Sequence, residues 1–239
     1  MRKITILSLL AIIVLTSCRY VGERVRGNGN LKTEDRSAAN FTSVSSFGEY
    51  DVYLSQGTSY SVRIEAEENL LPYIETIVDG DMLKIRTKEG YWLSNSTDLK
   101  IFVSAPAYSK VKTFGSGNIL SQGKLNNTSA IELEVAGSGD VKVEVNAPEV
   151  RADLQGSGNI DLSGETRTFT GSILGSGDIK AANLKSENAN VDITGSGNAD
   201  VYASVKLDVD IKGSGDVRYR GSAQTSSNVA GSGSVKKVD

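Results

Sequence analysis

The sequence contains no histidine and only one cysteine, and these two scarcities remove much of the usual catalytic chemistry. Without an imidazole there is no Ser-His-Asp triad, no histidine general base and no histidine-ligated metal. The single cysteine, Cys18, can form no disulfide within the chain. The Gly-Ser-Gly sequences lack both the triad of a nucleophile elbow and the lysine of a phosphate-binding loop. We therefore expect no enzymatic activity and no cofactor.

Apolar and aromatic residues are also few. Hydrophobic residues make up 38% and aromatic residues 6% of the 239 positions, and Trp92 is the one tryptophan. This is little for a globular core, but a solenoid tolerates it because each coil is stabilised largely by its neighbours. The formal net charge of −3 gives no reason to expect a nucleic-acid partner.

A Gly-Ser-Gly motif, followed in most copies by Asn or Asp, occurs seven times in steps of 22, 19, 19, 20, 18 and 18 residues. A period near 20 is typical of a stacked repeat architecture. We predict that each copy is a tight corner, where a side chain has no room and only glycine adopts positive φ freely. The first glycines of the copies are Gly115, Gly137, Gly156, Gly175, Gly195, Gly213 and Gly231.

Apolar residues occupy even-numbered positions relative to these glycines in successive copies. Even offsets place side chains on one face of an extended chain, so the repeats are predicted to be strands with an apolar inner face. Two residues before the glycine stand Val135, Leu154, Ile173, Ile193, Ile211 and Val229. Four residues after it stand Ile119, Val141, Ile160, Ile179, Ala199, Val217 and Val235.

The outward positions predict that equivalent residues lie directly above one another. Five residues after the glycine the charge alternates through Lys142, Asp161, Lys180, Asp200 and Arg218. Opposite charges stacked at about 4.8 Å would attract, and the Asn and Asp residues of the corners alternate in the same way. We predict an all-β fold, a single-stranded right-handed parallel β-helix of about ten coils of 18–22 residues.

Residues 1–17 have the features of a lipoprotein signal peptide. A basic start precedes an apolar run too short to span a bilayer, and Leu15-Thr16-Ser17-Cys18 resembles the lipobox, in which Cys18 becomes acylated after cleavage. The alternative is an ordinary signal peptide with an incidental cysteine. Cleavage removes two of the 26 basic residues and none of the 29 acidic ones, which moves the net charge from −3 to −5. Because Arg19 replaces an inner-membrane aspartate signal and no acidic export cluster follows, we expect an outer-membrane lipoprotein; the periplasm-facing orientation is favoured, and display on the cell surface is the alternative.

The rest of the chain divides into three parts. Residues 18–40 read as the lipidated cysteine and a polar tether, 41–112 as atypical N-terminal coils of the solenoid, and 113–239 as the regular repeat solenoid. In the last coil Thr225 and Ser227 replace apolar residues. We therefore expect either an edge protected by lysines or self-association of two copies through the open C-terminal coil.

A family resemblance follows from these features. The lipobox, the opening Phe41, Val44, Gly48, Asp51 and Val52, and the repeated motif together resemble the family of putative autotransporter adhesins with a head GIN domain. The resemblance spans about residues 40–235 and implies a β-solenoid, common in Bacteroidetes-type bacteria, without established catalytic residues. The chain differs from a true autotransporter in that its expected anchor is a lipid.

Two groups of residues are candidate ligand sites. Three residues before the glycine, an outward column carries Glu134, Asp153, Asp192 and Asp210. A solvated face is the favoured interpretation of this column; the alternatives are cation binding and, because glycosidases need two positioned acids, catalysis. The aspartates of the corners are too sparse for calcium. Tyr91 and Trp92 stack on a sugar or anchor a protein contact if exposed, although packing against the core is the favoured interpretation.

Two functions remain open. The first is a non-enzymatic, lipid-anchored envelope protein that uses its solenoid surface as an adhesin or scaffold, with an envelope protein or a glycan as partner. The second is a carbohydrate-binding or polysaccharide-processing β-helix that uses the acidic column and Trp92.

Overall fold

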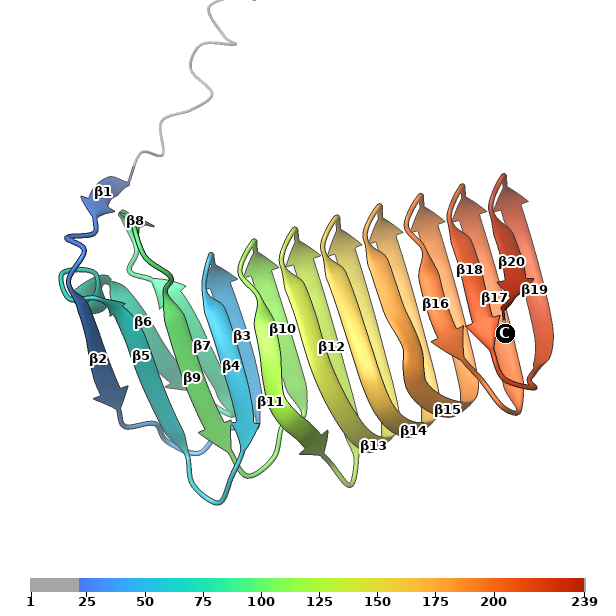
Figure 1. Cartoon of the computed structure of the whole chain (residues 1–239), viewed down its shortest axis with the longest axis horizontal. Coiled ribbons are helices and arrows are strands. Elements are labelled where there is room, and N and C mark those ends of the chain that lie inside the picture. Colours follow the sequence, from blue (N-terminus) through green and yellow to red (C-terminus); the bar gives the residue numbers. More distant parts are fainter. Residues whose placement is uncertain (1–21, 239) are drawn as a thin grey trace, which may run out of the picture.

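Two faces of parallel strands, joined by tight corners along one edge and wide turns along the other, form a flattened β-solenoid (Figure 1). The structure is a computed structural model that describes residues 22–238. The predicted signal peptide and Cys18 lie outside the described residues. Within residues 22–238 no helix is long and apolar enough to cross a membrane.

The two faces are called upstream and downstream after the strands that lead into and out of the Gly-Ser-Gly corners, and at the N-terminal end each face also contains strands that adjoin no corner. In spatial order the strands of the upstream face are β6 (Ile74–Asp79), β7 (Met82–Thr87), β3 (Ser43–Gly48), β10 (Lys110–Gly115), β12 (Ala130–Gly137), the second halves of β13 (Asp140–Gly156), β14 (Asn159–Gly175) and β15 (Asp178–Gly195), then β17 (Lys206–Gly213) and β19 (Gln224–Gly231).

In spatial order the strands of the downstream face are β2 (Leu31–Arg36), β5 (Ser61–Glu67), β9 (Lys100–Ala105), β4 (Asp51–Gln56), β11 (Ile119–Asn126), the first halves of β13, β14 and β15, then β16 (Ala199–Tyr202), β18 (Asp216–Arg220) and β20 (Ser234–Lys237). Strands β13 to β15 run unbroken around the wide turn, so both faces belong to one 18-stranded sheet.

The predicted inward columns form the core. Equivalent residues of neighbouring coils pair in register, as Val141 does with Ile160 and Ile160 with Ile179. These side chains and Val217 are at most 1% exposed, and the column two residues before the glycine is buried from Val135 to Ile211. The parallel β-solenoid class and the stacking of equivalent residues are therefore confirmed.

The corners need both of their glycines. Gly137 has φ +137°, and a Cβ there would lie 2.3 Å from the carbonyl oxygen of Gly115 in the preceding coil. A Cβ at Gly139 would lie 2.1 Å from the carbonyl oxygen of Gly117. The same two Cβ contacts recur at each later corner. The coils approach so closely because N–H groups of one corner donate to the carbonyl oxygen of the first glycine in the preceding coil, at 2.8 Å for Ser138 and 3.0 Å for Gly139.

Residues 41–112 differ from the predicted stack of successive coils. Strands β3 and β4 form the first coil, and Gly48 pairs with Gly115 as an early copy of the corner. The segment between β4 and β10, which we call the excursion, runs back to the other side of this coil. There β5 pairs antiparallel with β9, and β6 pairs antiparallel with β7. In Figure 1 the light-blue β3 and β4 accordingly lie between the green β7 and β9 and the later β10 and β11. The solenoid therefore has about seven turns and not about ten.

The segment that follows β5 covers the N-terminal end of the hydrophobic core. The short 3-10 helix η1 (Leu71–Tyr73) buries Leu71, and Ile74 and Leu70 are also buried there. The guanidinium of Arg36 on β2 donates to the carbonyl oxygens of Ile74 and Leu71. This end of the core is thereby covered, as terminal repeats of solenoids require.

The prediction that residues 18–40 are a polar tether is wrong for residues 22–40, which the structure describes. Strand β1 (Glu23–Arg26) pairs with β8 (Tyr91–Ser94), and β2 pairs antiparallel with β5. The connection between β1 and β2 is held by Glu67, which is 1% exposed. Its carboxylate accepts from the Gly29 N–H at 2.6 Å, the Ser96 hydroxyl at 2.6 Å and the Ser96 N–H at 2.9 Å.

The last coil is thin, as predicted. In β19 the side chain of Val229 is 38% exposed, and Ser227, which replaces a core residue, is exposed as well. Self-association through this coil stays a prediction.

Two alanine substitutions separate crowding from backbone strain. Gly123 has φ +124°, close to that of Gly137, but a Cβ at Gly123 would meet nothing within 4 Å. We expect Gly123→Ala to cost about 1 kcal/mol of unfolding free energy through its φ alone. Gly137→Ala should cost roughly 1–3 kcal/mol more because it also crowds the Gly115 carbonyl. Urea unfolding measures both, and equal losses would contradict the crowded corner.

Loss of the Glu67 carboxylate should destabilise the protein at neutral pH only. The Ser96 hydroxyl, helped by backbone N–H groups, holds the pKa of Glu67 below its ordinary value of 4.5. The stabilisation is therefore complete above about pH 4.5 and is lost as the pH falls through the folded-state pKa. We expect Glu67→Gln to cost about 1–3 kcal/mol at pH 7 and to approach the wild type in acid. The exposed Glu187→Gln is the control, and an acid-independent penalty would disprove this role.

Candidate binding surfaces

The predicted acidic column lies on the outside of the upstream face, and most of its members have partners. Glu134 pairs with Asp153 in register, and Asp192 pairs with Asp210. The Glu134 carboxylate contacts the Lys112 ammonium at 2.5 Å, and the Asp210 carboxylate contacts the Lys212 ammonium at 3.2 Å. Residues 22–238 hold no group of three or more side chains suited to a metal ion.

Asp153 is the member of the column that differs electrostatically. Its burial, followed by the nearby carboxylates of Glu132 and Glu134, raises the pKa of Asp153 above its ordinary value. Ser172 separates this side chain from Asp192 in the register. The column is thus an outer face on which Glu134 and Asp210 are ion-paired, and Asp153 is the one acid whose pKa is raised.

Asn and Asp residues of neighbouring corners are joined by hydrogen bonds into a ladder in two runs, from Asp51 to Asn159 and from Asp178 to Asp216. Asp140 Oδ1 accepts from both the backbone N–H and the Nδ2 of Asn159, each at 2.8 Å. In the alternate step, the Asp140 N–H donates to Asn118 Oδ1 at 3.2 Å. Asn198 bonds to Asp178 in the same way, at 3.0 Å. The alternation is needed because each carboxylate requires an amide donor above it.

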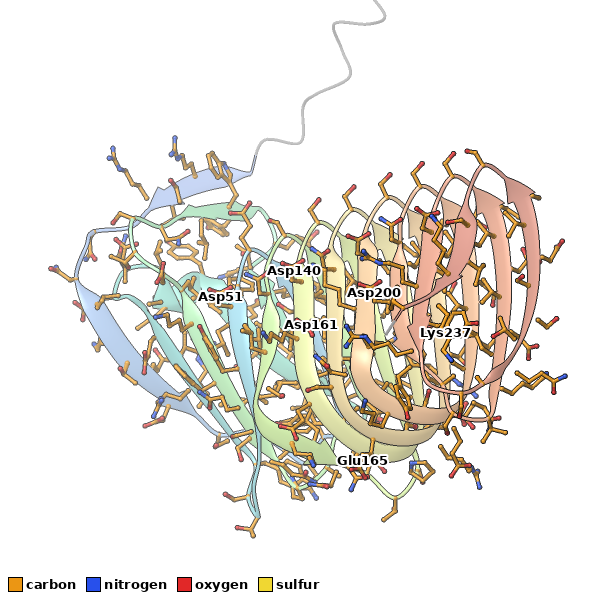
Figure 2. All side chains as sticks on the ribbon, turned by 45° about the vertical axis from the view of Figure 1, so that its right-hand side comes forward. Asp51, Asp140, Asp161, Glu165, Asp200 and Lys237 are labelled. Atoms are coloured by element: carbon orange, nitrogen blue, oxygen red, sulfur yellow. The ribbon has the colours of Figure 1, made fainter. Side chains whose placement is uncertain are left out.

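Beside this ladder, the downstream face carries a hollow of about 340 Å³. Its sides are the corner ladder and the charged column, and Tyr53 and Leu120 form its apolar part. Figure 2 views this region, with Asp140 near the glycine corners and Asp161 and Asp200 farther along the same face. Lys142 contacts Asp161 at 3.8 Å, so the ammonium group is held only loosely. The full lining is Asp51, Tyr53, Asn118, Leu120, Asp140, Val141, Lys142, Asn159, Asp161 and Lys180.

An aromatic platform supports one end of this hollow. Tyr53 on β4 and Phe102 on β9 are directly paired, with ring centroids 5.1 Å apart and planes at 17°. The Arg63 guanidinium lies 4.5 Å from the Phe102 centroid, which extends the stack by a cation–π contact. Tyr53 is therefore pre-oriented, with its neighbour Leu120 on the side of the hollow.

A wider groove of about 800 Å³ follows the edge opposite the corners. It is rich in amides: Asn146 donates to Asn126 at 3.3 Å, and the Gln56 amide bonds to the backbone of Asn126. Glu165 marks this edge in Figure 2. The groove lies where the wide turns differ in length from coil to coil, and the longest spacing between motif copies is the 22 residues from Gly115 to Gly137.

Tyr91 and Trp92 lie on β8, at the N-terminal end of the molecule. The Trp92 side chain is 46% exposed, so the favoured interpretation that it packs against the core is wrong. Tyr91 points the other way and contacts Tyr73, with ring centroids 4.7 Å apart. The two residues border a hollow of about 260 Å³ near Gly48.

Comparison with known families settles the relationship. A family model described as "Putative auto-transporter adhesin, head GIN domain" matches residues 40–223. The chain belongs to this family. The resemblance predicted from the corner motifs is thus confirmed, and the adhesin-like family suggests a protein of the cell envelope or cell surface.

Solved structures of similar proteins share the fold. A structure named a putative adhesin from Bacteroides fragilis has a TM-score of 0.85 at 22% identity, covering 90% of this chain and 100% of the other. One named a putative lipid binding protein from Parabacteroides distasonis has a TM-score of 0.73 at 27% identity, covering 91% and 100%. A putative adhesin from Parabacteroides merdae has a TM-score of 0.72 at 25% identity, covering 91% and 100%. No curated protein matches.

The corner ladder yields a matched pair of substitutions. Asn159→Asp removes the amide donor to Asp140 and places three carboxylates in consecutive coils, since Asp178 follows in register. We expect a loss of about 1 kcal/mol in unfolding free energy at pH 7, because like charges in neighbouring coils repel. Asp140→Asn keeps the accepting oxygen and should change stability less. Urea unfolding checks this, and equal losses for both variants would refute the ladder.

Proposed function

We propose that the protein is a non-enzymatic, lipid-anchored adhesin of the outer membrane, tied to the membrane by acylated Cys18. The lipobox Leu15-Thr16-Ser17-Cys18 supports the anchor, and family membership supports the adhesive role. Orientation toward the periplasm remains our preference over the cell surface, on the sequence after Cys18.

The hollow on the downstream face is the observation that carries the adhesive part of the proposal. It places an ordered tyrosine, Tyr53, beside two lysines and the oxygen- and nitrogen-rich corner ladder. An aromatic face and closely spaced carboxylate, amide and ammonium groups suit the apolar face and the hydroxyl groups of a sugar ring. A glycan is therefore the ligand class that we propose for this surface.

Polysaccharide processing is the weaker alternative. Glu134 and Asp210 of the upstream column are ion-paired, and Ser172 interrupts the column between Asp153 and Asp192. Depolymerisation by the wild type that is lost in Asp192→Asn and Asp210→Asn would nevertheless establish it and overturn the non-enzymatic proposal.

Adhesion of beads coated with the purified full chain to immobilised glycans of the bacterial envelope and to acidic and neutral polysaccharides tests the binding surface. We expect Tyr53→Ala to lower retention about tenfold, which corresponds to the loss of about 1.4 kcal/mol of stacking energy. Phe114→Ala is the matched control, because Phe114 stacks on Phe47 at 4.8 Å on the other face. Equal retention of both variants, or no retention of the wild type, would argue against a glycan site here.

A further inference from the structure

The two-stranded ribbon of β1 and β8 stands apart from the solenoid and has an outer face of unusual composition. Arg24 pairs with Trp92, and Arg26 pairs with Ser94, so these four residues share one face. The opposite face packs inward through Leu93, which contacts the core. Figure 1 shows the ribbon beyond the N-terminal end of the strands. The only tryptophan of the chain and two arginines are thus presented together to solvent.

The arginine and tryptophan are already organised on this face. The Arg24 guanidinium lies 4.7 Å from the Trp92 ring centroid and donates to the Ser94 hydroxyl at 2.7 Å. Around this pair the exposed charges are mixed: Lys88 lies near the Tyr91 ring, and Glu23, Glu49 and Glu89 are exposed, with Glu49 bordering the same hollow as Trp92. Arg24 and Arg26 are on the tryptophan face, while Glu23 pairs in register with Tyr91 on the other face.

The ribbon cannot move far from residue 18. Three residues lie between Cys18 and Gly22, where the described structure begins, and the four Cα–Cα steps from Cys18 to Gly22 span at most about 14 Å. The ribbon is also fixed to the solenoid, because Glu67 holds Gly29 and Ser96 just beyond it. The Asn69 side chain adds a bond to the Arg26 carbonyl at 2.8 Å. Any anchor at Cys18 therefore holds this end of the molecule itself.

We propose that the face formed by Arg24, Arg26 and Trp92 docks on the phospholipid headgroups of the membrane. The proposal rests on acylation of Cys18, the anchor proposed above. Each headgroup layer is roughly 5–8 Å thick, so a reach of about 14 Å leaves the ribbon within about 10 Å of that layer. Indole rings favour the interface between lipid and water, and guanidinium groups bind phosphate oxygens.

A glycan is the competing occupant of this face. A sugar ring would stack on the indole, but the Arg24 guanidinium already covers one face of it. A headgroup phosphate needs no such displacement, since it would bind the guanidinium while the indole edge enters the interface. The short connection to Cys18 favours the membrane further, because it brings lipid to this face at high effective concentration.

Fluorescence of the single tryptophan tests the docking. The acylated full chain is reconstituted into vesicles of phosphatidylethanolamine and phosphatidylglycerol, with or without a lipid brominated near the headgroup. We expect Trp92 emission to shift to the blue and to be quenched at least twofold by the brominated lipid. The matched control is Trp92→Phe combined with Val205→Trp, since Val205 is 58% exposed in the wide turn after β16. Its indole should be neither shifted nor quenched.

The outcomes separate this inference from the proposed anchor. Mass spectrometry of Cys18 and flotation with the vesicles report the anchor, and their failure would overturn both. Flotation with equal quenching at positions 92 and 205, or quenching of Trp92 by mucin glycans on intact vesicles, would overturn the docking alone. Arg24→Glu combined with Arg26→Glu should float normally but lose most of the quenching, and retained quenching would exclude the arginines.

Discussion

The close approach of one glycine corner to the next is the constraint on which the structure depends. The carbonyl of the first glycine accepts two N–H groups from the next coil at most corners, and no Cβ fits into that contact. Coils that meet so closely at one edge have a single allowed register. That register places apolar residues in buried columns and sets the charge and amide ladders outside. The core is narrow, but its packing is repeated in every coil.

This constraint explains which parts of the molecule the sequence revealed. The corner glycines, the inward columns and the alternating outer residues are local to each repeat, so their spacing alone predicted the regular coils and the family. The number of coils was overestimated because alternation in β5, β7 and β9 is the same for parallel and antiparallel neighbours. Pairing of Gly48 with Gly115 across 67 residues leaves no local signal.

The surface features that carry the functional proposals were harder to predict for the same reason. Tyr53 and Phe102 meet only because the excursion brings β9 beside β4. Hydrogen bonds of the Glu67 carboxylate connect β5 to Gly29 and Ser96, and they hold the polar, glycine-rich connection between β1 and β2 in place. Trp92 was singled out by its rarity, but its exposure depends on pairing with β1. Each of these contacts joins distant segments, and a hydrophobic pattern cannot indicate such contacts.

The excursion between β4 and β10 also has a consequence for the order of folding. Each later coil closes a loop of 18–22 residues on its predecessor, whereas the first coil must wait until residue 115 is available to cover it. Contacts between distant residues form late because closing the chain costs entropy first. Folding should therefore nucleate among the repeats and propagate toward the N-terminal end, so the part of the molecule that carries β1 and β8 would be the last to mature.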